Sequence, residues 1–439
     1  MLPASTNLKL ILRAFHHRNY RLFFCGQALS LVGTWTQRVA VGWLVYRLTE
    51  SAFLLGLVGF VGDLPIFLAA PFAGVLADRW NRHRSLVVMQ TLGMAQASIL
   101  AVLVLTGNVE VWHIIWLSIF LGCVNAFDVP TRQSFLLELI EKREDLGNAI
   151  ALNSSMVHAA RLVGPSLAGI FIAAMGEGIC FLLNAISFVP VIAALLAMKI
   201  QPKEKAAGNA RVLQSFKDGF TYVSHSAPIR SILLLLGLIS LVGMPYQVLM
   251  PVFAKDILLA GPRAFGFLVG CSGLGALAGA VYLASRKSVL GLERLIAMAA
   301  SLFGIGLIAF SFSRMLWLSL FLMLFTGFGM MVQMASSNTV LQTIVDDEMR
   351  GRLMGFYTMA YRGMVPVGSL LAGGLAAAIG APGTLFVSGV CCILGSVLFA
   401  SKLPFLREAI RPIYVKMGFL SDGSPGVQKP TGVVLPSEE

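Results

Sequence analysis

The sequence predicts an all-α polytopic membrane protein with twelve transmembrane helices in two pseudo-symmetric six-helix bundles. Three observations lead to this prediction: the composition, the alternation of basic loops and a weak internal repeat. Of the 439 residues, 57% are hydrophobic and 12% are charged, whereas an average soluble domain is about a quarter charged. Because each crossing needs about 20 apolar residues, a mean hydropathy of +0.81 indicates many spans and no sizeable soluble domain.

Apolar runs bounded by charged residues or glycine mark the expected helices. The first six are expected at 20–46, 52–76, 85–106, 111–129, 149–174 and 178–198, and the second six at 231–254, 264–284, 294–312, 315–340, 352–378 and 383–401. The expected domains are an amphipathic N-terminal segment, a first bundle, a linker, a second bundle and a tail, at 1–19, 20–198, 199–230, 231–402 and 403–439. In the tail we expect 405–420 to lie on the inner leaflet and the remainder to be disordered.

The 33 lysines and arginines fall mostly in alternate loops. With the N-terminus inside, the loops outside hold only Arg47, Lys255, Arg263 and Arg314. Since lysine and arginine collect in cytoplasmic loops, both termini, the linker and the tail are expected in the cytoplasm. The net charge of +12 is then a topology signal, and we expect no nucleic-acid partner.

Several classes of site are not expected. All six cysteines lie within apolar runs, where a thiol behaves as a small hydrophobe, so we expect no disulfide, metal site or cofactor. No small-residue cleavage site follows the first apolar run, so a removable signal peptide is not expected. The sequence has no GxxxxGK[ST] phosphate loop, which favours a gradient as the energy source; the alternative is a separate ATP-hydrolysing chain.

The two halves contain a repeated stretch. ARLVGPSLAGIFIAAMG begins at Ala160 and YRGMVPVGSLLAGGLAAAIG at Tyr361, which pairs Arg161 with Arg362. Two copies of a helical unit are typical of secondary transporters, whose substrate site lies between the repeats.

The segment GVLADRWNRHR at 74–84 resembles the loop motif G-x-L-A-D-R-x-G-R-[KR] of the major facilitator superfamily, with Asn81 in place of a glycine. This resemblance implies the major facilitator fold and a latch that holds the halves in one state. The expected latch residues are Gly74, Asp78, Arg79, Arg82, Asp128 and Arg132, and Asp128 is expected to cap its helix or to pair with Arg132. The alternative is that Asp78 and the arginines only fix the topology.

A narrower resemblance comes from 33–56, 125–169 and 341–355, which are similar to the transmembrane secretion effector branch that includes the enterobactin exporter. Within it, GPSLAG at 164–169 resembles a helix-five motif of exporters, so that Gly164, Pro165 and Gly169 are expected to kink the helix and to govern its opening. Ordinary packing of small residues is the alternative.

Charges inside the spans carry the expected function, because each is costly in lipid and faces a cavity or a partner. Asp63 and His158 are the candidates for proton coupling; the alternatives are a buried pair between Asp63 and Arg38, and simple packing of His158. The expected substrate cavity contains Arg38, Arg161, Arg362, Trp35 and Tyr246. For Arg161 a structural role is equally consistent with the sequence.

We therefore expect a non-enzymatic secondary active transporter that exports a small amphiphilic molecule, siderophore-like metabolite or drug, by proton-coupled alternating access. Its expected location is the bacterial inner membrane, and its expected partners are lipid, a small-molecule substrate and protons, with the chain a monomer. Broad multidrug efflux is one alternative. A lipid scramblase or a non-transporting membrane receptor is another, and neither would need Asp63 or Asp78.

Overall fold

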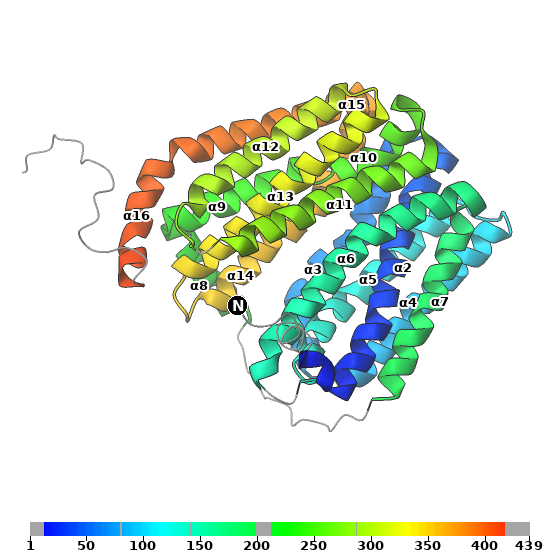
Figure 1. Ribbon diagram of the computed structural model, residues 1–439, viewed down its shortest axis with the longest axis horizontal. Helices are drawn as coiled ribbons and strands as arrows, with labels where there is room; N and C mark the ends of the chain where they lie inside the picture. Colours follow the sequence, from blue (N-terminus) through cyan, green and yellow to red (C-terminus); the bar gives the residue numbers. More distant parts are fainter. Residues whose placement is uncertain (1–12, 80, 141–142, 199–211, 287, 418–439) are drawn as a thin grey trace, which may run out of the picture.

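The computed structural model describes residues 13–79, 81–140, 143–198, 212–286 and 288–417, and these ranges are helical with short connections. A first group of helices comprises η1 (Arg13–His16), α2 (Arg18–Thr49), α3 (Ala52–Arg79), α4 (Arg82–Leu105), α5 (Val111–Leu136), α6 (Arg143–Met175) and α7 (Glu177–Leu196). They lie at the blue-to-green side of Figure 1.

A second group follows the amphipathic helix α8 (Val212–His225), which forms within the segment expected as a linker. It comprises α9 (Ala227–Leu238), η2 (Ile239–Gly243), α10 (Tyr246–Val252), η3 (Phe253–Ile257), α11 (Gly261–Ser285), α12 (Leu292–Phe312), α13 (Leu316–Ile344), α14 (Arg350–Thr358), η4 (Met359–Gly363), α15 (Met364–Ser401) and α16 (Leu403–Lys416). Residues 1–12, 199–211 and 418–439, which include most of the expected N-terminal segment and of the disordered tail, lie outside the described ranges.

Ten helical stretches of the described chain are long and apolar enough to cross a membrane. One of them, 350–401, contains a reversal at Gly380, whose φ of 78° and ψ of 160° are not helical and are readily adopted by glycine. The helices expected at 352–378 and 383–401 lie on either side of it. Helix α2 is not among the ten, since arginine, glutamine and threonine are spread along its 32 residues.

Two expected helices differ in detail. The helix expected at 231–254 is interrupted by the π-helical turns η2 and η3, and Pro245 and Pro251 lie along it, where each removes a backbone donor. Helix α5 runs to Leu136 rather than ending at 129. The added turns are polar, and their side chains have partners on the same helix. Thr131 donates to the Phe127 carbonyl at 2.7 Å, and Asp128 pairs with Arg132 at 3.1 Å.

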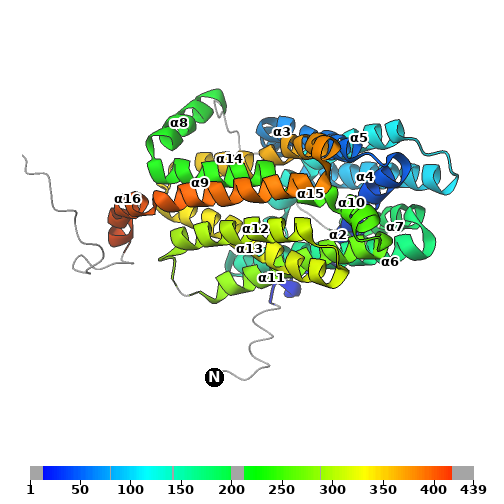
Figure 2. The same ribbon diagram turned by 90° about the horizontal axis from the view of Figure 1, so that it is seen from above.

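The helices pack mainly within their own groups. In the first group α2 lies against α6 and α7, and α3 and α4 lie against α5; in the second, α13 lies against α11 and α12, and α12 against α15. Two long contacts join the groups, α3 with α15 and α6 with α11. Figures 1 and 2 show the groups side by side, joined near α10 and separating toward α8 and α16.

Glycines allow these two inter-group contacts. A Cβ on Gly266 of α11 would lie 2.7 Å from the Gly169 Cα of α6, and one on Gly373 of α15 would lie 2.9 Å from the Gly56 Cα of α3. Side chains would therefore force the backbones apart, which shows that both pairs approach as closely as small residues permit. Both contacts lie near the end of the molecule where α2 stops and α3 starts, called here the Glu50 end; the opposite end, where α6 starts, is the Asp145 end.

Two adjacent glycines of α15, Gly373 and Gly374, provide a test of the contact between α3 and α15. We expect Gly373→Ala to lower the midpoint of thermal unfolding in detergent by several degrees, because its Cβ would lie 2.7 Å from the Ala52 carbonyl oxygen and overpacking costs about 1–3 kcal/mol. Gly374→Ala is the matched control, since a Cβ there meets nothing within 4 Å. Equal midpoints for the two variants would contradict the close approach of α3 and α15.

Candidate functional site

Trp35 of α2 is the centre of a charged cluster in the first group. The Arg38 guanidinium lies 5.6 Å from the centroid of the Trp35 ring, and the Arg161 guanidinium of α6 lies 5.5 Å from it. Arg38 also pairs with Asp63 of α3, with 3.3 Å between Nη2 and Oδ2. Three helices thus bring together four of the residues that the sequence singled out.

The cluster is open rather than enclosed. The side chain of Arg38 is 59% exposed and that of Asp63 is 32% exposed, so the pair predicted as one alternative exists but is not buried. A guanidinium in the middle of a span is costly in hydrocarbon and is found facing a cavity or a partner. The exposed side of this cluster is therefore a polar surface rather than a lipid-facing one.

The GPSLAG segment of α6 fixes the position of Arg161. Gly164 lies against α2, since a Cβ there would be 2.5 Å from the Trp35 Cβ, and the Thr36 hydroxyl donates to the Gly164 carbonyl at 3.1 Å. Gly164 follows Arg161 by about one helical turn, so this contact places the guanidinium beside the indole. Further along, Pro165 and Gly169 lie at the contact with Gly266 of α11, and the motif therefore packs against both groups.

The second group contributes Arg362, which lies in the π-helical turn η4 and is exposed. Its neighbour Tyr357 is buried and donates to the Met334 carbonyl at 3.4 Å. Among the described residues, neither Arg362 nor Arg161 forms an ion pair with a carboxylate. His158 precedes Arg161 on α6 and is half-buried.

Tyr246 has a different environment from the other cavity candidates. It is 1% exposed, and its hydroxyl hydrogen-bonds to the Ser272 hydroxyl and accepts from Gln247 at 3.3 Å. Its ring packs edge-on against Phe303 of α12. Tyr246 thus joins α10 to α11 and α12 inside the second group, away from the exposed side chains described above.

The predicted latch residues are distributed over the Asp145 end of the first group. Asp128 is buried and pairs with Arg132 at 3.1 Å, as expected, and it also accepts from Gln90 of α4 at 2.7 Å. Arg82 pairs with Glu138 at 2.6 Å. Gly74, Asp78 and Arg79 lie in the last turns of α3, where side chains are outside the described part of the structure.

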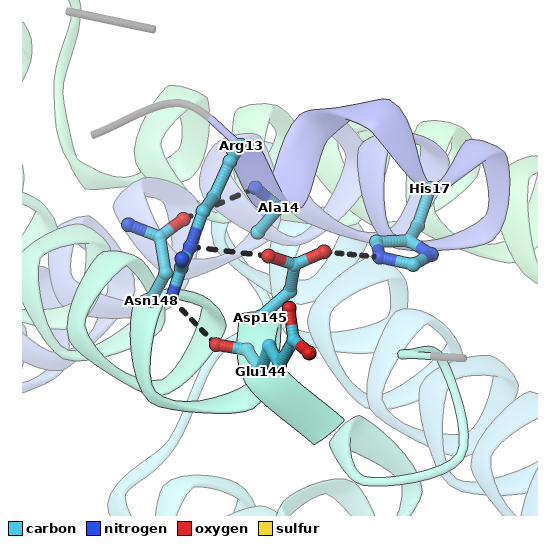
Figure 3. Close-up of polar contacts among 6 residues, drawn as sticks. All are labelled: Arg13, Ala14, His17, Glu144, Asp145 and Asn148. Carbon is cyan, nitrogen blue, oxygen red and sulfur yellow. Dashed lines mark hydrogen bonds and ion pairs between the residues drawn. The ribbon is translucent and has the colours of Figure 1, made fainter. Parts of the chain in front are cut away.

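A second cluster at the Asp145 end escaped the sequence analysis (Figure 3). Asp145 in the first turn of α6 accepts from Arg13 at 3.1 Å and from His17 at 3.0 Å, and Asn148 accepts from the Ala14 amide at 3.1 Å. Acidic side chains are favourable in the first turn of a helix, so Asp145 was recognisable as a capping residue. Its partners were not, because they lie more than 120 residues earlier, in η1 and at the residue that precedes α2.

Polar contacts between the groups also escaped prediction, and those among the described residues lie at the Glu50 end. Lys255 of η3 donates to Glu50 at 2.7 Å and lies over the Tyr46 ring, whose hydroxyl donates to Asp256. This contact lowers the pKa of Glu50, because its carboxylate accepts from the Lys255 ammonium. At the Asp145 end, each ion pair among the described residues lies within one group. The molecule is therefore closed at the Glu50 end.

The sequence is similar to those of known membrane transport proteins over most of its length. A family model described as "Transmembrane secretion effector" matches residues 11–413. The chain is 26% identical over 383 residues to the Staphyloferrin A transporter of Staphylococcus aureus, covering 86% of this chain and 95% of that one. It is also 26% identical to the Multidrug efflux pump Tap of Mycolicibacterium fortuitum, covering 84% and 92%, and to the Enterobactin exporter EntS of Shigella boydii, covering 89% and 93%.

Solved structures share the fold at low identity. A bacterial homolog of the lysosomal transporter Spinster, in an inward-facing conformation, superposes with a TM-score of 0.68 at 12% identity, covering 91% of this chain and 98% of that one. A bacterial homologue of the iron transporter ferroportin, also inward-facing, superposes with a TM-score of 0.66 at 18% identity, covering 88% and 98%.

The contact between Glu50 and Lys255 can be tested by reversing its charges. We expect Glu50→Lys and Lys255→Glu, made singly, to shift the protein away from closure at the Glu50 end, because like charges would then face each other. The measurement is a spin–spin distance between labels at Asn108→Cys and Leu259→Cys, in a background without native cysteines. Each single variant should lengthen the mean distance and the double swap should restore it.

The control is Asp347→Lys, which changes the charge of a side chain that is 86% exposed and pairs with Arg350, the first residue of α14. This change should leave the distance unaltered. An unchanged distance in both Glu50→Lys and Lys255→Glu would mean that this ion pair does not hold the groups together.

Proposed function

Because the chain belongs to the transmembrane secretion effector family of the major facilitator superfamily, we propose that it exports a small amphiphilic molecule by alternating access. Members of this family are membrane transport proteins, so the chain is a multi-pass bacterial membrane transporter and not an enzyme. The observation that carries the proposal is the partly exposed cluster of Trp35, Arg38, Asp63 and Arg161 within the spans. Such a polar surface inside a membrane protein is typical of a substrate path.

The proposed topology has twelve crossings. Dividing the longest candidate span at Gly380 and counting α2 as a crossing converts ten candidates into twelve. The bundles are then 20–198 and 231–402, joined by 199–230, and the alternation of lysine and arginine places both termini in the cytoplasm of a bacterial inner membrane. With this orientation the Glu50 end faces outward, and the structure corresponds to a cytoplasm-open state.

Alternating access would then break one set of contacts and form another. The outward end opens when the Glu50–Lys255 contact and the glycine contact of α6 with α11 separate. The cytoplasmic end closes when the loop at 74–84, with Asp78 as the latch, meets the second bundle, and Gly164, Pro165 and Gly169 transmit this movement from α11 to Trp35. A latch of this kind is a helix-terminus or surface ion contact of about 0.3–1 kcal/mol, which is weak enough to break in each cycle.

Asp63 is the proposed site of proton exchange. Its carboxylate is shared between Arg38 and the exposed surface, so a hydroxyl-bearing substrate can donate to it while it is deprotonated. Protonation removes the negative charge and leaves a weaker acceptor, so proton and substrate compete for this carboxyl group, as antiport requires. His158, one turn from Arg161, is the second candidate, because histidine titrates near neutral pH.

The proposed cargo is a siderophore-like metabolite, since two of the similar transporters carry siderophore names. Broad drug efflux is the second candidate, favoured by the similarity to the pump Tap and by the aromatic face of Trp35. If no solute is transported, the alternative function is that of a lipid scramblase or a non-transporting receptor.

The test is uptake of labelled substrates into inside-out vesicles with an acidic lumen. We expect a catecholate siderophore or a cationic dye to accumulate in a gradient-dependent manner, and we expect Asp63→Asn to abolish gradient dependence because the exchangeable proton is lost. Asp347→Asn is the control, because Asp347 is exposed and pairs with Arg350 three residues away.

The alternative outcomes assign the function differently. Accumulation unchanged by Asp63→Asn would move proton exchange to His158, which His158→Gln would then test. Absence of accumulation for every substrate and gradient would overturn export and favour the scramblase or receptor.

A further inference from the structure

The arginines that the sequence predicted for the substrate cavity differ in their counter-charges. Arg38 has a carboxylate partner in Asp63 at 3.3 Å. Arg161 contacts the Trp35 ring instead of a carboxylate, and Arg362 is exposed in η4 without an ion pair among the described residues. Gly363, next to Arg362, lies against the Phe67 ring of α3, one turn after Asp63, so η4 borders a helix of the cluster. Among the described residues, Arg161 and Arg362 have no carboxylate partner.

This imbalance opposes closure of an empty site. Moving water away from two uncompensated guanidiniums raises their free energy, because the interior screens and solvates charge poorly. An anion that neutralises both removes this cost. Since Arg161 belongs to α6 and Arg362 to η4, one ligand must carry negative groups at two positions to reach both bundles.

The Trp35 ring adds a requirement for shape. An indole beside a guanidinium offers a flat apolar face next to a hydrogen-bonding fork, which suits a planar group that bears a carboxylate. Arg38 pairs with Asp63, and its guanidinium lies 5.6 Å from the centroid of the same Trp35 ring. Together these residues favour a planar organic anion.

We infer that the cargo is an organic anion with at least two negative groups, recognised by Arg161 beside Trp35 and by Arg362, and that its export is driven mainly by the membrane potential. This inference rests on the proposed export function and names its substrate class and driving force. An anion that leaves a cell with a negative interior moves down the potential. Each charge contributes on the order of a 50-fold concentration ratio per 100 mV, so a dianion gains about 2,500-fold.

Proton exchange at Asp63 adds to this force without replacing it. A single proton entering across a difference of one pH unit contributes about a tenfold ratio. Inward movement of a proton and outward movement of an anion transfer charge in the same direction. The potential therefore dominates whenever the cargo carries two or more charges.

Two dyes with the same planar xanthene scaffold and opposite charge provide the probes, carboxyfluorescein as the polyanion and rhodamine 6G as the cation. Inside-out vesicles receive valinomycin with high potassium in the medium and low potassium in the lumen, at equal pH, which makes the lumen positive. We expect carboxyfluorescein to accumulate in vesicles that contain the protein and not in vesicles that lack it. A lumen-acidic pH gradient without a potential should move it at least tenfold less.

Variants assign the effect to the two arginines. Arg161→Gln and Arg362→Gln should each reduce carboxyfluorescein accumulation at least tenfold, and Arg161→Lys should retain part of it because the charge remains. Arg21→Gln, which removes an exposed charge from the first turns of α2, should have no effect. Intrinsic tryptophan fluorescence, quenched by carboxyfluorescein in wild type and less in Arg161→Gln, reports binding independently of transport and of the energy source.

Outcomes separate this inference from the proposed function. Potential-driven accumulation of carboxyfluorescein that depends on both arginines supports it. Accumulation of rhodamine 6G with the pH gradient, without movement or binding of carboxyfluorescein, would leave export intact and overturn the anionic class. Movement of neither dye under either gradient would overturn both.

Discussion

The cost of placing a charge in hydrocarbon organises this molecule. A guanidinium or carboxylate at mid-span is destabilising unless it meets water, a partner or an aromatic face, and this chain places Arg38, Arg161 and Asp63 in one small region. Arg38 takes Asp63 as its partner, and both arginines use the Trp35 ring. Helices α2, α3 and α6 must therefore keep these faces turned toward the polar surface rather than toward lipid.

Close packing of glycine complements this constraint. Lipid tails are as apolar as the helices, so helix association depends on close contact instead of on hydrophobic burial. Gly164 lets α6 pack closely against α2 beside Trp35. Gly169, a few residues later, lets the same helix pack against Gly266 of the second group. One short segment thus positions a candidate binding residue and also forms one of the two long contacts between the groups.

The sequence predicted the family and the helical architecture because both follow from local properties. Hydropathy marks spans, and the loop motif at 74–84 is contiguous. The pair of Asp128 with Arg132 was predictable for the same reason, since residues four apart share a helix face. Prediction of the Arg38–Asp63 pair required the assumption that neighbouring helices place these two residues at the same depth. The sequence therefore left two roles open for Asp63, an ion pair with Arg38 or a site of proton exchange.

Other contacts depend on tertiary structure, and single-sequence patterns do not contain them. Arg13 and His17 meet Asp145 across the bundle, and Lys255 meets Glu50 across the two groups. The sequence predicted Tyr246 as a residue of the substrate cavity, whereas its hydroxyl is hydrogen-bonded to Ser272 inside the second group. Burial of a single aromatic ring depends on helix rotation, which the π-helical turns of this region change by an amount that composition does not encode.

The three π-helical turns are unevenly distributed between the groups. Among the described residues, all three lie in the second group, at Ile239–Gly243, Phe253–Ile257 and Met359–Gly363, whereas the spans of the first group are continuous α-helix. A π-helical turn is a point at which a helix can bend, and two of the three contain Lys255 and Arg362. Bending at these two turns would move the partner of Glu50 and the second guanidinium relative to the first group.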